Sequence, residues 1–327
     1  MRPRATGEPS ALPLGARVAA IDIGTNTVLL TVAERVPAGG DLAGELQVIG
    51  ERHAITRLGQ GVDRQGTLDP GAIDRTLACL ELYRQETVHL GAGRVLCVGT
   101  SALRDAASGE AFVARASDIL GCPVEVVSGA REAELTFRGA LSSLDPSRAN
   151  TEREPIDAAS LVLAFDIGGG STEIVLGTAA GEVQSAASVN VGSVRLFERY
   201  GDSSWDEATR AVIAALPPPL PSSPDLVIGI AGTMTTLWTL AYGMPFEESS
   251  AAERPLRTER IARLATELRA LPVEARQHQL GIDAGRADVI PFGALVASEI
   301  LRFIGASQVR VTGRGVRYGL LLETLAG

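Results

Sequence analysis

The chain has 327 residues, a formal net charge of −9, 45% hydrophobic residues and 21% charged residues. This profile is typical of a globular protein of one large or two ordinary domains, and the acidic balance argues against a nucleic-acid partner. All 30 Lys and Arg residues are arginine, which excludes a P-loop lysine and a Schiff-base lysine, and no apolar run is long enough to span a membrane.

Three scattered cysteines form no C-x-x-C pair, and three scattered histidines have no metal-ligand spacing. Free thiols in a reducing compartment are the simplest interpretation, and we therefore expect a cytoplasmic protein without a His-based zinc site.

The first half of the chain opens with residues 1–15, rich in Arg, Pro, Gly and Ala, which predict a disordered tail. Residues 17–23 end a short apolar run at Asp22-Ile23-Gly24, and residues 27–33 are β-branched, so two strands joined by a tight turn are expected. Further strands are expected at 46–56, 95–99 and 124–127, and helices at 70–83, after Thr100-Ser101 and at 111–120.

The second half begins after a polar stretch at 141–160, which predicts a loop or insertion. Residues 161–167 (LVLAFDI) repeat the opening pattern, with Asp166 lying 144 residues beyond Asp22, so a duplicated α/β domain is expected. Each Asp-Ile-Gly hairpin is antiparallel, which predicts mixed sheets. Strands are expected at 182–190, 226–231 and 309–312, and helices at 233–240, 258–270, 288–303 and 316–325.

The segment 166–173 (DIGGGSTE) has the composition of a phosphate-binding turn. Gly168, Gly169 and Gly170 let the backbone approach a ligand, and successive amide N–H groups in such a turn form an anion-binding nest. Ser171 and Thr172 add hydroxyl donors. Asp166 and Glu173 are hard oxygen ligands of the kind Mg²⁺ prefers. The alternative is a tight turn with incidental acidic flanks.

The segment 22–27 (DIGTNT) is the corresponding turn of the first half. It has the same aspartate and first glycine, Asp22 and Gly24, followed by Thr25, Asn26 and Thr27 as donors. Alone this turn is weak evidence, but two copies at matching places in a repeat predict two phosphate-binding turns that face each other across a cleft.

These turns look like the phosphate-binding hairpins of the superfamily that contains actin, sugar kinases and heat-shock chaperone ATPases. Six segments narrow the resemblance: 99–106 (GTSALRDA), 128–133 (SGAREA), 166–173 (DIGGGSTE), 192–195 (GSVR), 232–236 (GTMTT) and 313–319 (GRGVRYG). Together they resemble the exopolyphosphatase/guanosine pentaphosphate phosphatase (Ppx/GppA) family over roughly residues 16–322.

The resemblance implies an α/β fold of duplicated actin-like (ribonuclease H-like) domains, with mixed five-stranded sheets flanked by helices and the active site in the interdomain cleft. Domain I would comprise residues 16–127 plus 313–327, and domain II residues 128–312.

The resemblance also points to Glu132 as the catalytic base. A positioned carboxylate can accept the proton of an attacking water, whereas the competing interpretation is an exposed acid at a helix start. Arg104 would bind phosphate, with a surface salt bridge as its alternative. Two departures stand out: Ser108 lies where the family often has Asn, and Tyr318 lies where it usually has Glu, so we assign Tyr318 no role.

We therefore expect a Mg²⁺-dependent exopolyphosphatase (Mn²⁺ being an alternative metal) that releases orthophosphate from the end of polyphosphate by a Glu-activated water. The expected phosphate-binding residues are Gly24, Thr25, Asn26, Arg104, Gly168, Gly169, Gly170, Ser171 and Thr172, and the expected metal ligands are Asp22, Asp166 and Glu173. The runner-up substrate is guanosine pentaphosphate. More distant alternatives are a small-molecule kinase and an actin-like or chaperone-like nucleotide switch. The resemblance is also compatible with a homodimer.

Overall fold

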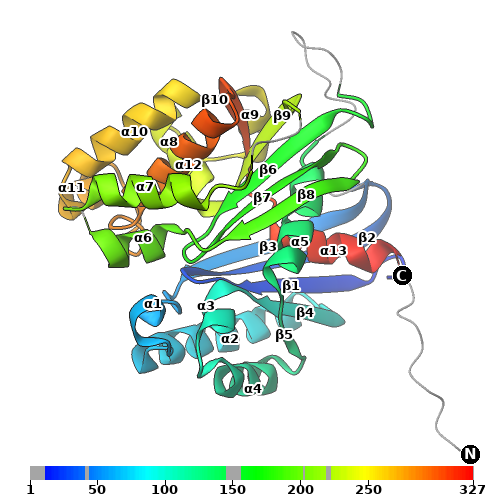
Figure 1. Cartoon of the computed structure of the whole chain (residues 1–327). Coiled ribbons are helices and arrows are strands. Elements are labelled where there is room, and N and C mark those ends of the chain that lie inside the picture. Colours follow the sequence, from blue (N-terminus) through cyan, green and yellow to red (C-terminus); the bar gives the residue numbers. More distant parts are fainter. Residues whose placement is uncertain (1–11, 41–43, 145–155, 202, 219–221, 327) are drawn as a thin grey trace, which may run out of the picture.

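The computed structural model of the chain describes residues 12–40, 44–144, 156–201, 203–218 and 222–326. Two β-sheets, each flanked by helices, form the two halves of the molecule (Figure 1). The first sheet has the strand order β3-β2-β1-β4-β5, and the second has the order β10-β11-β9-β6-β7-β8. Each sheet contains both parallel and antiparallel pairs, as the sequence predicts.

Among the residues that the structure describes, the first half contains a five-stranded sheet and the four helices α1 to α4. Its strands are β1 (Arg17–Ile23), β2 (Thr27–Gly40), β3 (Gly44–Ile55), β4 (Arg94–Gly99) and β5 (Val124–Val126). Its helices are α1 (Val62–Gln65), α2 (Pro70–His89), α3 (Ser101–Asp105) and α4 (Gly109–Leu120). Asp69 caps α2 by accepting the N–H of Ala72 at 2.9 Å, with Pro70 at the first helical position.

The second half has six strands rather than the expected five, because the two-residue strand β10 pairs with β11 at the edge. Its strands are β6 (Leu161–Ile167), β7 (Thr172–Thr178), β8 (Val183–Val189), β9 (Leu226–Ile230), β10 (Leu256–Arg257) and β11 (Gln308–Thr312). The helices are α6 (Ser193–Tyr200), α7 (Trp205–Ala215), α8 (Ala231–Tyr242), α9 (Glu248–Glu253), α10 (Thr258–Ala270), α11 (Val273–His278) and α12 (Ile290–Phe303).

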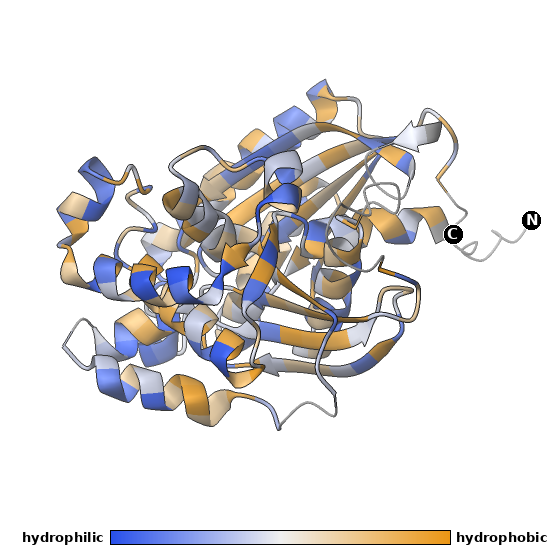
Figure 2. Ribbon diagram, turned by 90° about the horizontal axis from the view of Figure 1, so that it is seen from above, coloured by the Kyte–Doolittle hydropathy of each residue, from blue (hydrophilic) through white to orange (hydrophobic). Residues whose placement is uncertain are grey.

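The strands β1 and β6 are buried on both faces, and the same sequence of buried and half-buried positions recurs in both. One face of β1 presents Ile21 to a core shared with α2 and α4, and the other presents Ala20 to a core shared with α13 (Val316–Ala326). Burial on both faces explains why these strands read as continuous apolar runs, which Figure 2 shows as hydrophobic colouring along the strands.

The helices α5 (Gly129–Leu141) and α13 connect the halves and pack against each other. A Cβ on Gly319 would lie 2.2 Å from the Leu135 carbonyl oxygen, and one on Gly139 would lie 2.1 Å from that of Gly315. Two glycines therefore allow backbone-to-backbone contact at this crossing. After β11, α13 returns to the first half and contacts β1.

The disorder expected for residues 1–15 is wrong for residues 12–15, which the structure describes. Residues 1–11 lie outside the described residues, but Leu12 is buried and its N–H donates to the Thr324 carbonyl at 2.9 Å. The apolar Leu12 side chain reaches the core beside α13, which composition alone does not reveal. The expected loop at 141–160 lies mostly outside the described residues, and its described end, 156–160, forms a turn around Asp157.

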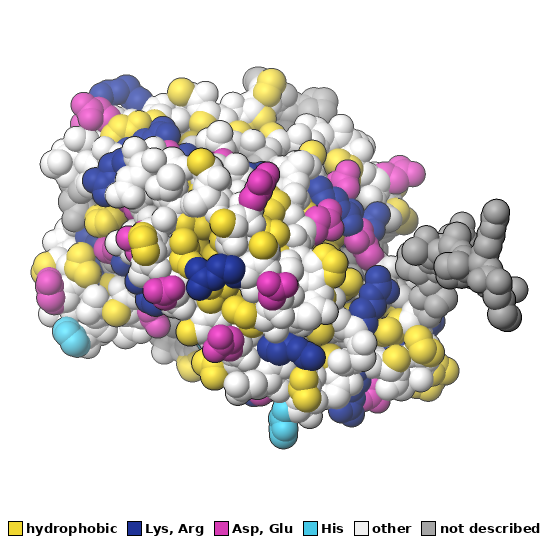
Figure 3. Space-filling view, turned by 90° about the horizontal axis from the view of Figure 1, so that it is seen from below, with side chains coloured by type: hydrophobic (Ala, Val, Ile, Leu, Met, Phe, Trp, Pro, Cys, Tyr) yellow, Lys and Arg dark blue, Asp and Glu magenta, His cyan; other side chains and the backbone are white. Residues whose placement is uncertain are grey.

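The surface in Figure 3 carries basic and acidic side chains interspersed among each other. Among the helices that the structure describes, none has both the length and the hydrophobicity required to cross a membrane.

Candidate functional site

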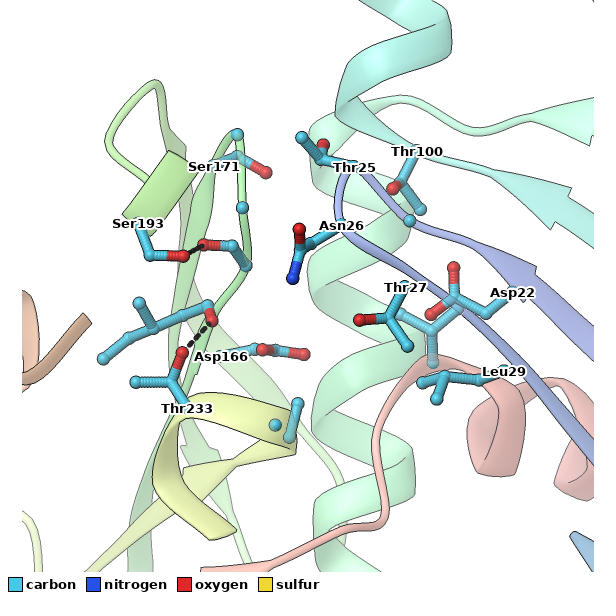
Figure 4. Close-up of a pocket in the computed structure, with 18 of the residues that line it drawn as sticks. Asp22, Thr25, Asn26, Thr27, Leu29, Thr100, Asp166, Ser171, Ser193 and Thr233 are labelled. Atoms are coloured by element: carbon cyan, nitrogen blue, oxygen red, sulfur yellow. Dashed lines mark hydrogen bonds between the residues drawn. The ribbon is translucent and has the colours of Figure 1, made fainter. Parts of the chain in front are cut away.

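A pocket lies between the two Asp-Ile-Gly turns, at the ends of β1 and β6 (Figure 4). Figure 4 shows Thr25 and Asn26 entering from the first half and Ser171 and Asp166 facing them from the second. The predicted site residues that line this pocket are Asp22, Gly24, Thr25, Asn26, Glu132, Asp166, Gly168, Gly169, Gly170, Ser171 and Glu173. The fold thus brings together eleven of the thirteen side chains and glycines expected from the sequence.

The start of α6 donates hydrogen bonds to the carbonyl groups of the second turn. The N–H groups of Ser193 and Val194 donate to the carbonyls of Gly168 and Gly169 at 3.0 and 2.9 Å, and Arg195 Nε donates to the Gly170 carbonyl at 2.7 Å. In a trans peptide the C=O and the next N–H point in opposite directions. Three carbonyls facing α6 therefore turn the following three N–H groups toward the pocket, where none has an acceptor among the described residues.

The first turn is held in the same manner by the segment after β3. The Gly59 N–H donates to the Thr25 carbonyl at 2.8 Å, and the N–H groups of Thr56 and Arg57 donate to the Asn26 carbonyl at 3.1 and 3.0 Å. The amides that follow these carbonyls consequently face the pocket. Two nests of backbone donors, one from each half, are the arrangement expected for a bound anion.

The duplication extends to two threonines that follow parallel strands. Thr100 comes after β4 and donates its hydroxyl to the Ile23 carbonyl at 3.5 Å; Thr233 comes after β9 and donates to the Ile167 carbonyl at 2.9 Å. Both line the pocket, as Figure 4 shows. Thr100 caps its helix without a side-chain bond to it, so its hydroxyl serves the turn rather than the cap expected from the sequence.

Glu132 lies in the first turn of α5 and is buried, with 7% of its surface exposed. Its carboxylate lines the pocket and forms a salt bridge with Arg104 at 2.5 Å. Burial raises the pKa of Glu132, while the neighbouring Arg104 lowers it. The structure thus excludes the exposed-acid interpretation for Glu132. It applies instead to Glu134, whose half-exposed side chain pairs with Arg131 at 3.5 Å.

Arg104 does not line the pocket. Its guanidinium donates to the Val127 carbonyl at 3.0 Å and to Glu132 at 2.5 Å. The sequence predicts direct phosphate binding by Arg104, whereas in this structure it holds the carboxylate of Glu132. The expected surface salt bridge is also wrong, because the Glu132 partner is buried.

Thr172 is the other predicted residue that the pocket does not include. It is the first residue of β7, fully buried, and its hydroxyl donates to the Val191 carbonyl at 2.5 Å. Its hydroxyl is thus bonded to Val191, whereas Ser171, in the turn just before β7, lines the pocket.

Three further acids surround the pocket without enough positive charge to balance them. Desolvation, followed by the charges of Glu132 and Asp166, raises the pKa of Asp22 to about 8; desolvation and Glu132 raise the pKa of Asp166 to about 7. Burial also raises the pKa of Glu173 well above its ordinary value. Asp22 Oδ1 is buried and has no hydrogen-bond partner among the described residues.

This charge excess fits a divalent cation. Hard carboxylate oxygens with an unsatisfied buried atom suit Mg²⁺, which commonly uses one or two carboxylates and retains several waters. Within the described part of the chain, no three His, Cys, Asp or Glu side chains are grouped closely enough to form a preassembled metal site.

The sequence predicts Gly192-Ser193 and Gly232-Thr233 as turn elements that line the second half's side of the cleft, and Ser193 and Thr233 do line the pocket. The structure adds two pocket residues that the sequence did not place in the site, Thr100 and Arg286. The glycine before Thr100, Gly99, was the signal available for the first of these. Arg286 follows no recognisable motif. It donates to the Gly232 carbonyl at 2.6 Å and to the Thr236 hydroxyl at 2.8 Å. Desolvation lowers its pKa, and the charge of Asp283 opposes this shift.

Tyr318, to which the sequence assigns no role, forms a hydrogen bond with a neighbouring acid in the structure. Its hydroxyl donates to Glu51 at 2.8 Å, and Glu51 pairs with Arg317 at 3.1 Å. The charge of Arg317 lowers the pKa of Asp22, which sets Arg317 close to the pocket.

Comparison with known proteins gives consistent results. The sequence pattern of the Ppx/GppA phosphatase family matches residues 35–326. The chain is 37% identical over 332 aligned residues to exopolyphosphatase 2 of Mycobacterium tuberculosis, covering 95% of this chain and 99% of that protein. It is 26% identical to a guanosine-5'-triphosphate,3'-diphosphate pyrophosphatase of Photobacterium profundum, covering 96% of this chain and 60% of that one. The crystal structure of the Aquifex aeolicus member of the Ppx/GppA family superposes with a TM-score of 0.74 at 27% identity, covering 95% and 98% of the two chains.

Proposed function

The chain belongs to the Ppx/GppA phosphatase family, and on this premise we propose that it is an exopolyphosphatase that hydrolyses the terminal phosphoanhydride of inorganic polyphosphate. One observation carries the proposal: a buried carboxylate, Glu132, faces a pocket lined by two sets of unpaired backbone N–H groups. Amide nests bind phosphate oxygens, and a nearby carboxylate of raised pKa can accept a proton from water.

In the proposed reaction, the amides of the two turns, with Thr25, Asn26 and Ser171, hold the terminal phosphoryl group. Water attacks its phosphorus, Glu132 accepts the water proton, and the bond from phosphorus to the bridging oxygen breaks. The products are orthophosphate and a chain shorter by one phosphate. Positioning and electrostatic stabilisation supply most of the rate in this type of reaction.

The charged side chains around the pocket have separate roles in this scheme. Arg104 orients Glu132 through their salt bridge, and the desolvated Arg286 faces the anionic substrate. Asp22, Asp166 and Glu173 would hold Mg²⁺, with Mn²⁺ as the alternative, and the metal would neutralise phosphate charge. Without a cation these acids would repel the substrate, which is the physical reason for proposing a metal.

The test is orthophosphate release from polyphosphate in the presence of Mg²⁺. We expect the Glu132→Gln variant to fold and its kcat to fall at least ~10²-fold, because the amide of glutamine cannot accept the proton of the attacking water. Glu134→Gln is the matched control: it lies in the same helix but half-exposed and pairs with Arg131. Equal activity of the Glu132 variant and wild type would remove Glu132 from the mechanism, and no orthophosphate release by wild type would refute the proposed activity.

Guanosine pentaphosphate is the second candidate substrate, because the Photobacterium relative bears the name of a guanosine pentaphosphate-type pyrophosphatase. Both substrates present a terminal phosphoanhydride to the same pocket. Side-by-side kcat/KM values for guanosine pentaphosphate and for polyphosphates of several lengths would separate them. We expect the higher value for polyphosphate.

We further propose a cytoplasmic location and leave a homodimer as a prediction from the family. The three cysteines Cys79, Cys97 and Cys122 are unpaired, as expected in a reducing compartment. Equilibrium sedimentation would give the mass of the assembly, and fractionation of the source cells would give the compartment.

A further inference from the structure

Arg195 joins the second phosphate turn to the opposite half of the molecule. It is the third residue of α6, and its side chain is 11% exposed. All three guanidinium nitrogens are engaged: Nε donates to the Gly170 carbonyl at 2.7 Å, Nη2 to Asp105 at 2.5 Å, and Nη1 to Asp63. Gly170 belongs to the second turn, whereas Asp63 and Asp105 lie on α1 and α3 of the first half.

The two turns also touch each other beside Arg195. A Cβ on Gly170 would lie 2.5 Å from Ser101 Oγ and 2.9 Å from Thr25 Oγ1. The first half therefore contacts the turn on one side while Arg195 holds the turn's carbonyl on the other. Separation of the halves would break the turn-to-turn contact and remove both carboxylates from Arg195 in the same movement.

The hydrogen bond to Gly170 has a direct effect on the phosphate site. The Gly170 carbonyl and the Ser171 N–H belong to one peptide plane and point in opposite directions. Arg195 fixes this carbonyl away from the pocket and thereby turns the Ser171 N–H toward it. The planar guanidinium fork holds three acceptors in fixed relative directions, which an ammonium cannot do.

We propose that Arg195 is a positioning residue that couples closure of the two halves to assembly of the second phosphate turn. With Asp63 and Asp105 in place, the guanidinium is held where it orients Gly170; when the halves separate, the turn loses this support. The inference rests on the proposed function for its ligand, a terminal phosphoryl group, and gives Arg195 no direct contact with that group.

The kinetic test compares Arg195→Gln, Arg195→Lys and wild type on polyphosphate. We expect Arg195→Gln to raise KM by ~10-fold or more and to lower kcat by a smaller factor. In this variant part of the free energy of substrate binding is used to order the turn, so the observed affinity falls. Arg195→Lys should be intermediate, since it keeps the charge but not the fork. Arg199→Gln is the matched control: Arg199 is in the same helix and pairs with the same Asp63, but it is 47% exposed and does not contact Gly170.

A double-mutant cycle distinguishes coupling from two separate effects. Asp105→Asn removes one of the first-half partners, and the double variant with Arg195→Gln should be no worse than Arg195→Gln alone, within about twofold. Multiplicative losses would mean that the two residues act independently, which would overturn the coupling.

A readout without turnover uses the Glu132→Gln background and tripolyphosphate. We expect hydrogen exchange to slow on binding in both 168–192 and 57–66, and addition of Arg195→Gln to abolish the slowing in 57–66. If Arg195 had only a structural role, Arg195→Gln would lower Tm but would leave unchanged both KM at 20 °C and the slowing of hydrogen exchange in the two segments. That result would overturn the inference. Failure of wild type to hydrolyse polyphosphate would instead count against the proposed function.

Discussion

The salt bridge between Arg104 and Glu132 sets the pH range in which Glu132 can accept a proton. Burial raises the pKa of Glu132 and Arg104 opposes that rise. Since only the ionised carboxylate can act as a base, the activity should fall as pH decreases through this pKa.

Replacement of Arg104 therefore tests its role as a positioning cation. We expect Arg104→Gln to raise the pKa of Glu132 and to move the acid limb of the kcat/KM profile to higher pH, measured between pH 5 and pH 9. Arg131→Gln is the control, because Arg131 pairs with Glu134 and Glu323 rather than with Glu132. An unmoved acid limb in Arg104→Gln would show that the pair does not tune the base.

At the residue scale, the sequence predicts the glycines, the acids and Glu132, because these lie within short motifs whose chemistry is local. It fails for Thr172, whose position at the start of β7 turns its hydroxyl toward Val191. It also fails for Arg286, because the loop that brings this residue to Gly232 is fixed by tertiary contacts rather than by a motif.

At the element scale, the glycine contacts between α5 and α13 fix how closely the two connecting helices approach. We expect Gly319→Ala to destabilise the protein by about 1–3 kcal/mol, since its methyl group would lie 2.2 Å from the Leu135 carbonyl oxygen. Urea unfolding would measure the loss. Gly93→Ala is the control, because its nearest neighbour would be 3.9 Å away. Equal stabilities of the two variants would show that the helices separate without cost.

The elements found from the sequence are those with a strong periodicity or a clear start, such as β1, β6 and α2. The hairpins and the repeat were predictable because duplication presents the same pattern twice. Helix α6 was not predicted, because it begins at the serine of the pair Gly192-Ser193, which the sequence indicates as a turn. Its function of holding three carbonyls of the second phosphate turn depends on its place in the fold. The extra strand β10 has only two residues, too few for a pattern.

At the scale of the whole molecule, the acids of the pocket make stability depend on pH. The pKa of Asp22 rises from its ordinary 3.8 to about 8, and that of Asp166 from 3.8 to about 7. The folded protein therefore binds more protons than the unfolded chain in this window, so the free energy of unfolding decreases as pH rises from about 4 to about 8.

The corresponding experiment compares Tm values in EDTA at pH 5.5 and pH 8. We expect wild type to lose at least ~5 °C between them and Asp22→Asn to lose less, because the amide does not ionise. Asp118→Asn, at an exposed position, is the control and should follow wild type. Mg²⁺ should raise the Tm of wild type at pH 8 more than that of Asp22→Asn. Identical pH dependence in Asp22→Asn and wild type would contradict the assigned repulsion.

The return of α13 to the first half has a consequence for how the protein is made. Tyr318 and Leu321 complete the core that covers one face of β1, beside Val18 and Ala20. The first sheet ends at Val126 and α13 begins at Val316, 190 residues later, so during synthesis that face lacks α13 for roughly 10–40 s at about 5–20 residues per second. The nascent first half therefore has an incompletely covered apolar sheet face throughout this interval, and transiently exposed apolar surface of this kind favours aggregation.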